Sequence, residues 1–276
     1  MLCTTSDLPI YYETYGSGRP IVMLHGYYPD HRLMTGCMEP IFAQRPGWLR
    51  LYPDLPGMGR TPAREWIAGT DQMLEVVLGF IDQVLPGGRF AVAGESYGGY
   101  LARGIVGRRP EQVTGLFLLC PLIVPDAGRR RLPPRVTLVS DPELMASLPP
   151  ADAAEFDDVA VVQTAAHWAR FCDEVLPGLR LADSPFLERL RANAYGFTFD
   201  ADTLPQPFER PGLIVAGRQD VSVGYRDAWD ILEKYPRTTF AVLDKAGHDL
   251  QIEQAGVFDA LVDEWLDRME AEEGSS

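Results

Sequence analysis

Residues 94–99 read GESYGG and follow directly on the run RFAVA at 89–93. A serine between glycines at the end of an apolar strand occurs in ordinary tight turns, because glycine and serine are common turn residues. The same stretch fits G-x-S-x-G, the nucleophile elbow, in which a sharp strand-to-helix turn exposes a serine hydroxyl at the edge of a sheet. The remainder of the chain decides between these two interpretations.

Strand-like and helix-like segments alternate over most of the chain. Short β-rich or apolar runs predict strands at 9–15, 20–24, 49–52, 90–93, 113–122, 212–217 and 238–243. Apolar residues at helical spacing predict helices at 32–43, 71–85, 97–107, 225–234 and 257–270. This alternation indicates an α/β fold, in which a mostly parallel, doubly wound sheet carries helices on both faces.

One block interrupts the alternation. No strand pattern is found between Pro121 and Pro211, and helical patterns occur there at about 151–175 and 185–194. We predict that residues 123–210 form a helical cap or lid, inserted after the sixth strand of a core made of residues 1–122 and 211–276. The polar end of the chain, EAEEGSS at 270–276, is predicted to be disordered.

Composition restricts the partners of the protein. The 276 residues carry a formal net charge of −14 at pH 7, whereas nucleic-acid binding needs clustered lysine and arginine. No stretch approaches the roughly 20 apolar residues that span a bilayer, and the N-terminus lacks a signal-peptide pattern. We therefore expect a cytoplasmic monomer or homodimer that binds neither nucleic acid nor membranes.

The cysteines point to neither disulfides nor a metal site. They are widely spaced and form no CxxC pair, which is typical of reduced thiols; they are Cys3, Cys37, Cys120 and Cys172. We expect no metal and no cofactor.

A base and an orienting acid for the serine are found after later strands. His248 lies in AGHD after the strand at 238–243, and Asp220 lies in GRQD after the strand at 212–217. Loops after parallel strands open on the same edge of a sheet as the elbow. Because serine is a weak nucleophile without a base, we predict that Ser96 attacks, His248 is the general base and Asp220 orients it. Asp126, after the strand ending near Leu122, is the alternative acid, whereas Asp249 is expected to face away.

Two backbone N–H groups are predicted to bind the oxyanion. Tyr97 follows Ser96 at a helix N-terminus, where the helix dipole favours negative charge. Tyr27 lies in the loop after the strand at 20–24, which supplies the second donor at nucleophile elbows. His25 is expected to be a structural loop residue, and His31 to lie at the surface or at the edge of a cavity.

Glu95 has three possible roles. Its side chain could pack beneath the elbow, bind solvent or contact a basic group on the substrate.

Taken together, these motifs resemble those of the α/β-hydrolase fold superfamily over about residues 8–268. The order Ser96, Asp220, His248 is the order in that superfamily. The matching stretches are HGYY at 25–28, DLPGMGRT at 54–61, GESYGG at 94–99, GRQD at 217–220 and GHDLQIE at 247–253. The resemblance implies a structural role for Asp54. The elbow resembles small intracellular esterases and prolyl-iminopeptidase-like hydrolases, but Gly26 is followed by YYP instead of the HGGPG loop of those peptidases, which argues against peptidase activity.

The predicted function is that of a carboxylesterase-like serine hydrolase. It would cleave a small to medium hydrophobic acyl compound (an ester, thioester, lactone or amide) through an acyl-enzyme. The same triad could instead serve carbon–carbon bond hydrolysis, lyase or perhydrolase chemistry, or a prolyl-iminopeptidase-like peptidase; a non-catalytic ligand-binding protein is a further alternative. Aromatic residues of the cap are expected to line an apolar pocket above Ser96. The predicted substrate contacts are Tyr28, His167, Trp168 and Phe171, of which His167 could instead be a packed residue.

Overall fold

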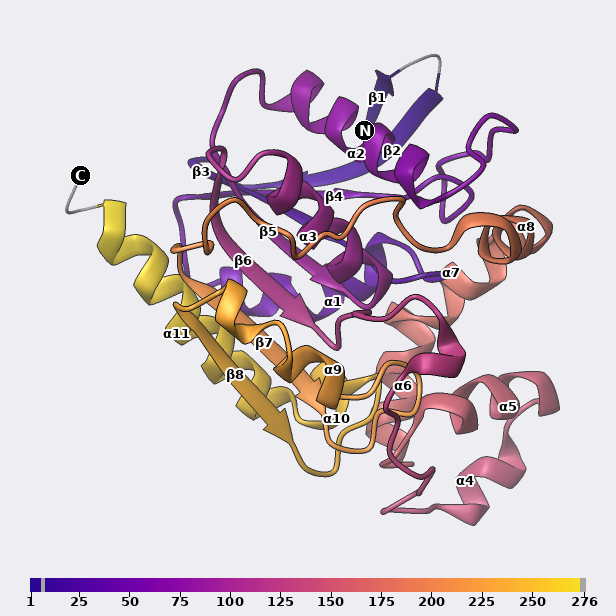
Figure 1. Ribbon diagram of the computed structural model, residues 1–276. Coiled ribbons are helices and arrows are strands. Elements are labelled where there is room, and N and C mark those ends of the chain that lie inside the picture. Colours follow the sequence, from indigo (N-terminus) through magenta and orange to yellow (C-terminus); the bar gives the residue numbers. More distant parts are fainter. Residues whose placement is uncertain (6–7, 274–276) are drawn as a thin grey trace.

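The computed structural model describes residues 1–5 and 8–273, and its eight described strands form one sheet in the order β1-β2-β4-β3-β5-β6-β7-β8 (Figure 1). β1 (Leu2–Thr5) pairs antiparallel with β2 (Leu8–Tyr15), and β2 pairs antiparallel with β4 (Trp48–Pro53). All further neighbours are parallel: β3 (Arg19–Leu24), β5 (Phe90–Glu95), β6 (Val113–Leu119), β7 (Gly212–Gly217) and β8 (Thr238–Leu243). The prediction of a mostly parallel α/β sheet is confirmed.

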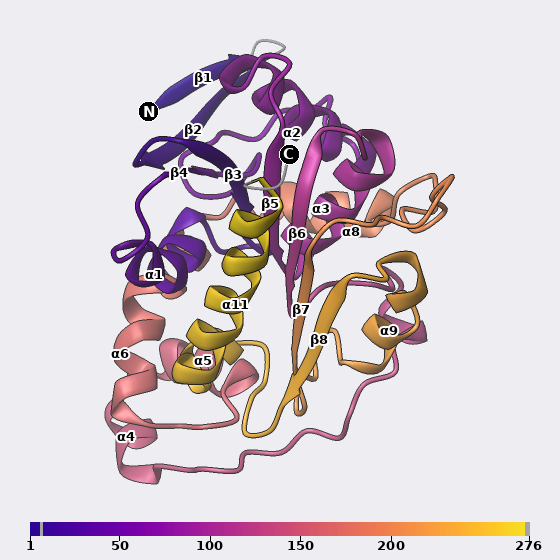
Figure 2. The ribbon, with the colours of Figure 1, turned by 90° about the vertical axis from the view of Figure 1, so that its left-hand side faces the viewer.

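Helices cover both faces of this sheet. Figure 2 shows α1 (His31–Phe42) and α11 (Ala255–Glu273) on one side, and α2 (Thr70–Val84), α3 (Tyr97–Arg108) and α9 (Arg226–Trp229) on the other. Every residue of the central strand β5 is buried. A strand covered on both faces has no polar side to present to solvent, which is why this segment of the sequence is continuously apolar up to Gly94.

Five helices lie between β6 and β7 in the chain, within residues 123–210, which we call the cap segment. They lie on the side of the sheet to which its parallel strands point (Figure 1), and α6 packs against α1 and α10 (Leu250–Glu253). The helices are α4 (Pro142–Ser147), α5 (Pro150–Val159), α6 (Ala165–Glu174), α7 (Leu176–Leu181) and α8 (Ser184–Ala194).

The helix predicted at 151–175 is two helices, because residues 160–164 are extended. There the backbone N–H groups of Val161 and Val162 donate to the Glu253 carboxylate, and the Thr164 hydroxyl caps α6 by accepting from the backbone of His167. The segment predicted as one helix at 225–234 is likewise divided, into α9 and the short 3₁₀ helix η2 (Leu232–Lys234). A second 3₁₀ helix, η1 (Ala127–Arg129), precedes the cap helices.

The two ends of the chain differ from expectation. Strand β1 was not predicted, because its sequence LCTT is short and half polar; it forms by pairing with β2. The expected disorder from residue 270 onward is wrong for residues 270–273, since α11 continues to Glu273 and Glu270 accepts a hydrogen bond from Trp48. Residues 274–276 lie outside the described part.

Among the described helices, none combines the length and the apolar character needed to cross a bilayer.

Candidate active site

Ser96 occupies a strained turn between β5 and α3. Its φ of 52° is in the left-handed region, where non-glycine residues cost about 1–3 kcal/mol and cluster at functional sites. A side chain at Gly94 would collide with the backbone of Gly98, and one at Gly98 would collide with the carbonyl groups of Leu24 and His25. The spacing of the glycines is therefore required by close backbone approach, as a nucleophile elbow needs and an ordinary surface turn does not.

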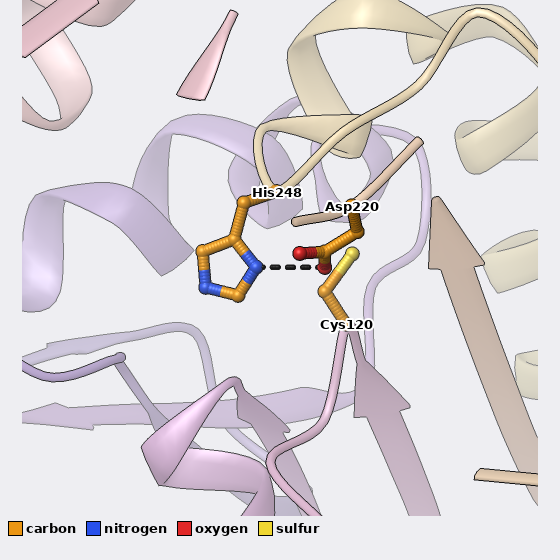
Figure 3. Close-up of side chains that lie close together, drawn as sticks. All are labelled: Cys120, Asp220 and His248. Atoms are coloured by element: carbon orange, nitrogen blue, oxygen red, sulfur yellow. Dashed lines mark hydrogen bonds and ion pairs between the residues drawn. The ribbon is translucent and has the colours of Figure 1, made fainter. Parts of the chain in front are cut away.

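Asp220 and His248, which follow the neighbouring strands β7 and β8 in the chain, form a hydrogen-bonded pair (Figure 3). The His248 Nδ1 donates to Asp220 Oδ2 over 2.8 Å. Asp220 is fully buried, and its Oδ1 accepts from the backbone N–H groups of Ser222 at 2.8 Å and Val223 at 3.1 Å. Burial alone would raise the pKa of Asp220, but His248 and the two backbone donors lower it below its ordinary value, so the carboxylate is ionised. An ionised Asp220 fixes both the ring orientation and the tautomer of His248.

Asp126, the alternative acid, is placed elsewhere. It is exposed, and its carboxylate accepts from the backbone of Gly128 as the cap of η1. Asp249 also does not contact His248 through a hydrogen bond; its Oδ2 lies 3.3 Å from His167 Nε2. Of the three carboxylates considered from the sequence, only Asp220 meets His248 at Nδ1.

The other ring nitrogen of His248 faces Glu95. The distance from His248 Nε2 to Glu95 Oε1 is 3.1 Å, and no hydrogen bond of the Ser96 hydroxyl is found among the described residues. Burial lowers the pKa of His248, but the carboxylates of Asp220 and Glu95 together raise it well above its ordinary value. The imidazole thus lies between two carboxylates, each of which favours its protonated form.

The two predicted oxyanion donors are free. Hydrogen bonds among the described residues leave the backbone N–H groups of Tyr27 and Tyr97 without an acceptor. Tyr97 begins α3, and Tyr27 follows Gly26, whose missing side chain allows that loop to lie against Ser96 and Glu95. Two unpaired donors beside a serine can bind a developing oxyanion.

A cavity of about 120 Å³ lies over Ser96. Its floor includes Glu95, Ser96 and His248, and apolar side chains of the cap segment form much of its wall; these are Val159, Phe171, Val175 and Leu179. A larger surface hollow of about 640 Å³, between α1 and α11, lies at other residues and contains no serine, cysteine or histidine. The small cavity is therefore the one that can hold a substrate beside Ser96.

Among the four predicted substrate contacts, only Phe171 lines this cavity as described. Trp168 packs behind it, with ring centroids 5.9 Å apart. His167 is buried, and its Nδ1 donates to the Val162 carbonyl while Nε2 faces Asp249. Tyr28 stacks edge-on against Tyr27 and donates its backbone N–H to Met58.

Two other histidines have structural surroundings. His25 is fully buried, accepts from the backbone N–H of Leu55 through Nε2 and donates through Nδ1 to the Gly26 carbonyl. His31 is buried as well, which corrects the expectation of a surface position; its Nδ1 lies 2.7 Å from Asp54 Oδ1. Asp54 also accepts from the Arg60 backbone, so it organises the loop 54–61.

Two clusters have the donor types of a metal site. The Cys120 thiol lies beside the Asp220–His248 pair (Figure 3), and Asp30, His31 and Asp54 form the second group. In the first cluster the Asp220 oxygens already accept from His248, Ser222 and Val223. In the second, Asp30 binds Arg32 and Asp54 binds His31. Internal hydrogen bonds thus account for these carboxylates in both clusters.

The sequence did not indicate how the cap segment is held next to His248. Glu253 accepts from Gly247, the residue before His248, and from Val161 and Val162 of the cap segment. The motif GHDLQIE contains Glu253, but the carboxylate's partners lie far away in the chain. Only the folded structure shows that this side chain joins the two segments.

Known proteins share the sequence pattern and the fold. Residues 21–261 match the sequence model of the alpha/beta hydrolase family. A proline iminopeptidase of Xylella fastidiosa (strain Temecula1) is 27% identical, with 90% of each chain covered. A pimeloyl-[acyl-carrier protein] methyl ester esterase of Nitrosomonas europaea is 37% identical over 111 residues, which are 40% of each chain. The crystal structure of an alpha/beta superfamily hydrolase from Oenococcus oeni PSU-1 superimposes with a TM-score of 0.88 at 29% identity, covering 98% of this chain and 99% of its own.

Proposed function

Because the chain belongs to the alpha/beta hydrolase family and is a hydrolase, we propose that it cleaves acyl compounds through Ser96, His248 and Asp220. One observation carries this proposal. The strained Ser96 elbow and the Asp220–His248 pair lie at the same edge of one sheet, and Ser96 and His248 line one cavity. In a merely structural turn a glycine would relieve the strain at position 96. A serine that lines the same cavity as a histidine oriented by Asp220 therefore supports a catalytic role.

The reaction has two acyl-transfer steps. Ser96 Oγ attacks the substrate carbonyl carbon while its proton passes to His248 Nε2, and the Tyr27 and Tyr97 N–H groups stabilise the oxyanion. The carbon–oxygen bond of an ester then breaks as His248 returns the proton to the leaving alcohol. Water attacks the acyl-serine as His248 takes one of its protons. The bond to Ser96 Oγ then breaks as His248 returns that proton to Oγ, which releases the acid and restores Ser96. His248 must be neutral at the start of each step, and Nε2 must turn from Glu95 to Ser96.

The substrate is a small to medium hydrophobic acyl ester. The cavity is small, and four apolar side chains of the cap segment line it beside Glu155 and Asp158, which suits a short acyl chain or ring more than a sugar or a nucleotide. We propose on this basis that the cap segment covers Ser96 and sets the acyl preference. Amide cleavage is a second candidate, favoured by the identity to a proline iminopeptidase along 90% of both chains.

The test is hydrolysis of benzyl esters with acyl chains of graded length, with aminoacyl anilides and lactones alongside. We expect short apolar esters to be cleaved and Ser96→Ala to lose about four to six orders of magnitude in kcat. Ser147, an exposed serine of α4, provides the matched control Ser147→Ala, which should behave as wild type. Near-wild-type turnover by folded Ser96→Ala would refute the proposed nucleophile, and cleavage of anilides alone would favour the peptidase.

A further inference from the structure

Glu95 is a buried carboxylate with too few partners. Its side chain is 2% exposed and forms part of the floor of the cavity over Ser96. Among the described residues no backbone N–H or hydroxyl donates to it, and its one cationic partner is His248, at 3.1 Å. An ionised carboxylate offers about four lone-pair sites, and buried charges are normally paired and hydrogen-bonded. The Glu95 carboxylate thus has capacity for a further donor from within the cavity.

The lining of the cavity is acidic as well as apolar. The exposed carboxylates of Glu155 and Asp158, both on α5, line the cavity, together with the buried Asp249. No lysine or arginine is found in its lining, as far as the described residues go. These charges attract a cation to the cavity and repel an anion.

We propose that Glu95 binds an ammonium group carried by the acyl part of the substrate, next to the carbonyl that Ser96 attacks. This inference rests on the proposed function and specifies its substrate class. Glu95 directly precedes Ser96, and its carboxylate contacts the imidazole nitrogen that serves Ser96. A cation on Glu95 therefore lies within a few bonds of the scissile carbonyl, which is the position of an α-amino group. The substrates are α-amino acyl esters or amides with a small apolar side chain.

The same contact has a consequence for His248. An ammonium group that pairs with Glu95 neutralises the charge that draws His248 Nε2 towards it. The imidazole then loses one of the two carboxylates that keep it protonated and can accept the proton of Ser96. Binding of the correct substrate thus frees the base, whereas a neutral ester of the same shape leaves the imidazole held by Glu95.

A protonated Glu95 that binds a substrate carboxylate is the competing arrangement. Burial raises the pKa of Glu95, as do the carboxylates of Asp249 and Asp220, whereas His248 lowers it. The anion itself is disfavoured, because in this cavity it would face Asp249, Glu155 and Asp158 without a compensating base. The two arrangements predict opposite preferences for charged substrates, so one set of esters separates them.

The experiment compares benzyl butyrate with its α-amino, α-hydroxy and α-carboxy derivatives. Assays run at about pH 6.5, where an α-amino group of pKa about 7.7–8.0 is protonated. For wild type we expect kcat/KM for the α-amino ester to exceed that of the α-hydroxy ester by about ten- to a hundredfold, the range of a charge-assisted hydrogen bond. Glu95→Gln should lose most of this ratio, which is taken between two esters cleaved by the same variant and so does not depend on the variant's overall rate. Glu111→Gln, an exposed carboxylate away from the cavity, is the control and should keep the ratio.

Several outcomes would overturn the proposal. An unchanged ratio in folded Glu95→Gln would show that Glu95 does not bind the amine, and preference for the α-carboxy ester would favour the competing arrangement. If Glu95→Gln does not fold, inhibition of wild-type benzyl butyrate hydrolysis decides: butylammonium should inhibit about tenfold more strongly than butanol, and equal inhibition would refute the proposal. Failure of the proposed function looks different, since then none of the esters would be cleaved in a Ser96-dependent way.

Discussion

Asp220→Asn is the substitution whose effect the structure specifies most fully. In the native site Asp220 Oδ1 accepts from two backbone N–H groups and Oδ2 accepts from His248 Nδ1. An asparagine keeps the backbone bonds only if its carbonyl oxygen takes the Oδ1 position, so its NH₂ group faces Nδ1. Because that group is a donor, the histidine must leave Nδ1 unprotonated and carry its proton on Nε2. This tautomer cannot accept the proton of Ser96.

The expected loss is large because Glu95 stabilises the wrong tautomer. A protonated Nε2 donates to the Glu95 carboxylate 3.1 Å away, which adds to the loss from the asparagine itself. An asparagine at the orienting position of a serine triad lowers kcat by about 10⁴-fold, equivalent to about 5 kcal/mol of transition-state stabilisation. We therefore expect a kcat on benzyl butyrate that is at least about 10⁴-fold lower, with a thermal unfolding midpoint within a few degrees of wild type because the backbone bonds persist.

The matched control is Asp126→Asn. Asp126 is exposed on η1, so this variant should retain wild-type kcat. If folded Asp220→Asn stayed within tenfold of wild type, the orienting role of Asp220 would be refuted, and an inactive Asp126→Asn would move the acid to that loop.

Three further predictions concern the pKa of His248, the wall of the cavity and a buried ion pair. The carboxylates of Asp220 and Glu95 raise the pKa of His248, and this base acts only when neutral, so kcat/KM for a neutral ester should rise with pH through the raised pKa. Glu95→Gln removes one of the two carboxylates and should move the rising limb of the pH profile to lower pH. An unmoved limb would contradict the contact between Glu95 and His248. Phe171→Ala enlarges the cavity and should shift the kcat/KM ratio of long to short acyl esters by about tenfold. Trp168 packs against Phe171 outside the cavity, so Trp168→Ala should lower the thermal stability and leave this ratio within twofold. Equal shifts in the two variants would show that neither side chain sets specificity. Arg103→Met leaves the Asp202 carboxylate without its buried partner and should lower the free energy of unfolding in urea by about 3–5 kcal/mol. Arg108→Met, which breaks an exposed pair with Glu75, should lower it by at most about 1 kcal/mol. Similar losses in the two variants would contradict the burial of the Arg103–Asp202 pair.

The strands and the elbow could be predicted because their signals are local. The run at 212–217 coincides with β7, a fully buried strand that is continuously apolar and ends at a glycine. The run at 238–243 coincides with β8, a half-buried edge strand whose β-branched and aromatic residues favour extended structure. β6 ends at Leu119, before the predicted residue 122, because Cys120 adopts a φ of 39° and turns the chain. A left-handed cysteine has no sequence signal, so this boundary was beyond prediction.

Long-range contacts account for what the sequence could not show. Glu95 is recognisable as the residue before the serine, but its contact with His248 depends on how the loop after β8 returns to the end of β5. His167 looks like a possible substrate contact in a helix of aromatic residues, yet it faces Asp249 on a segment distant in the chain. The periodicity and composition of a sequence describe neighbours along the chain, whereas these side chains meet their partners only when distant segments pack together.

The most direct test of the central claim is covalent labelling with a fluorophosphonate, followed by mass spectrometry of the digested protein. A nucleophilic serine activated by a histidine reacts with such a probe, whereas ordinary serines do not. We predict one adduct, on the peptide that contains Ser96, with labelling lost in Ser96→Ala and strongly slowed in Asp220→Asn. Labelling of a different serine, or ester hydrolysis that persists in protein with no adduct at Ser96, would contradict the account.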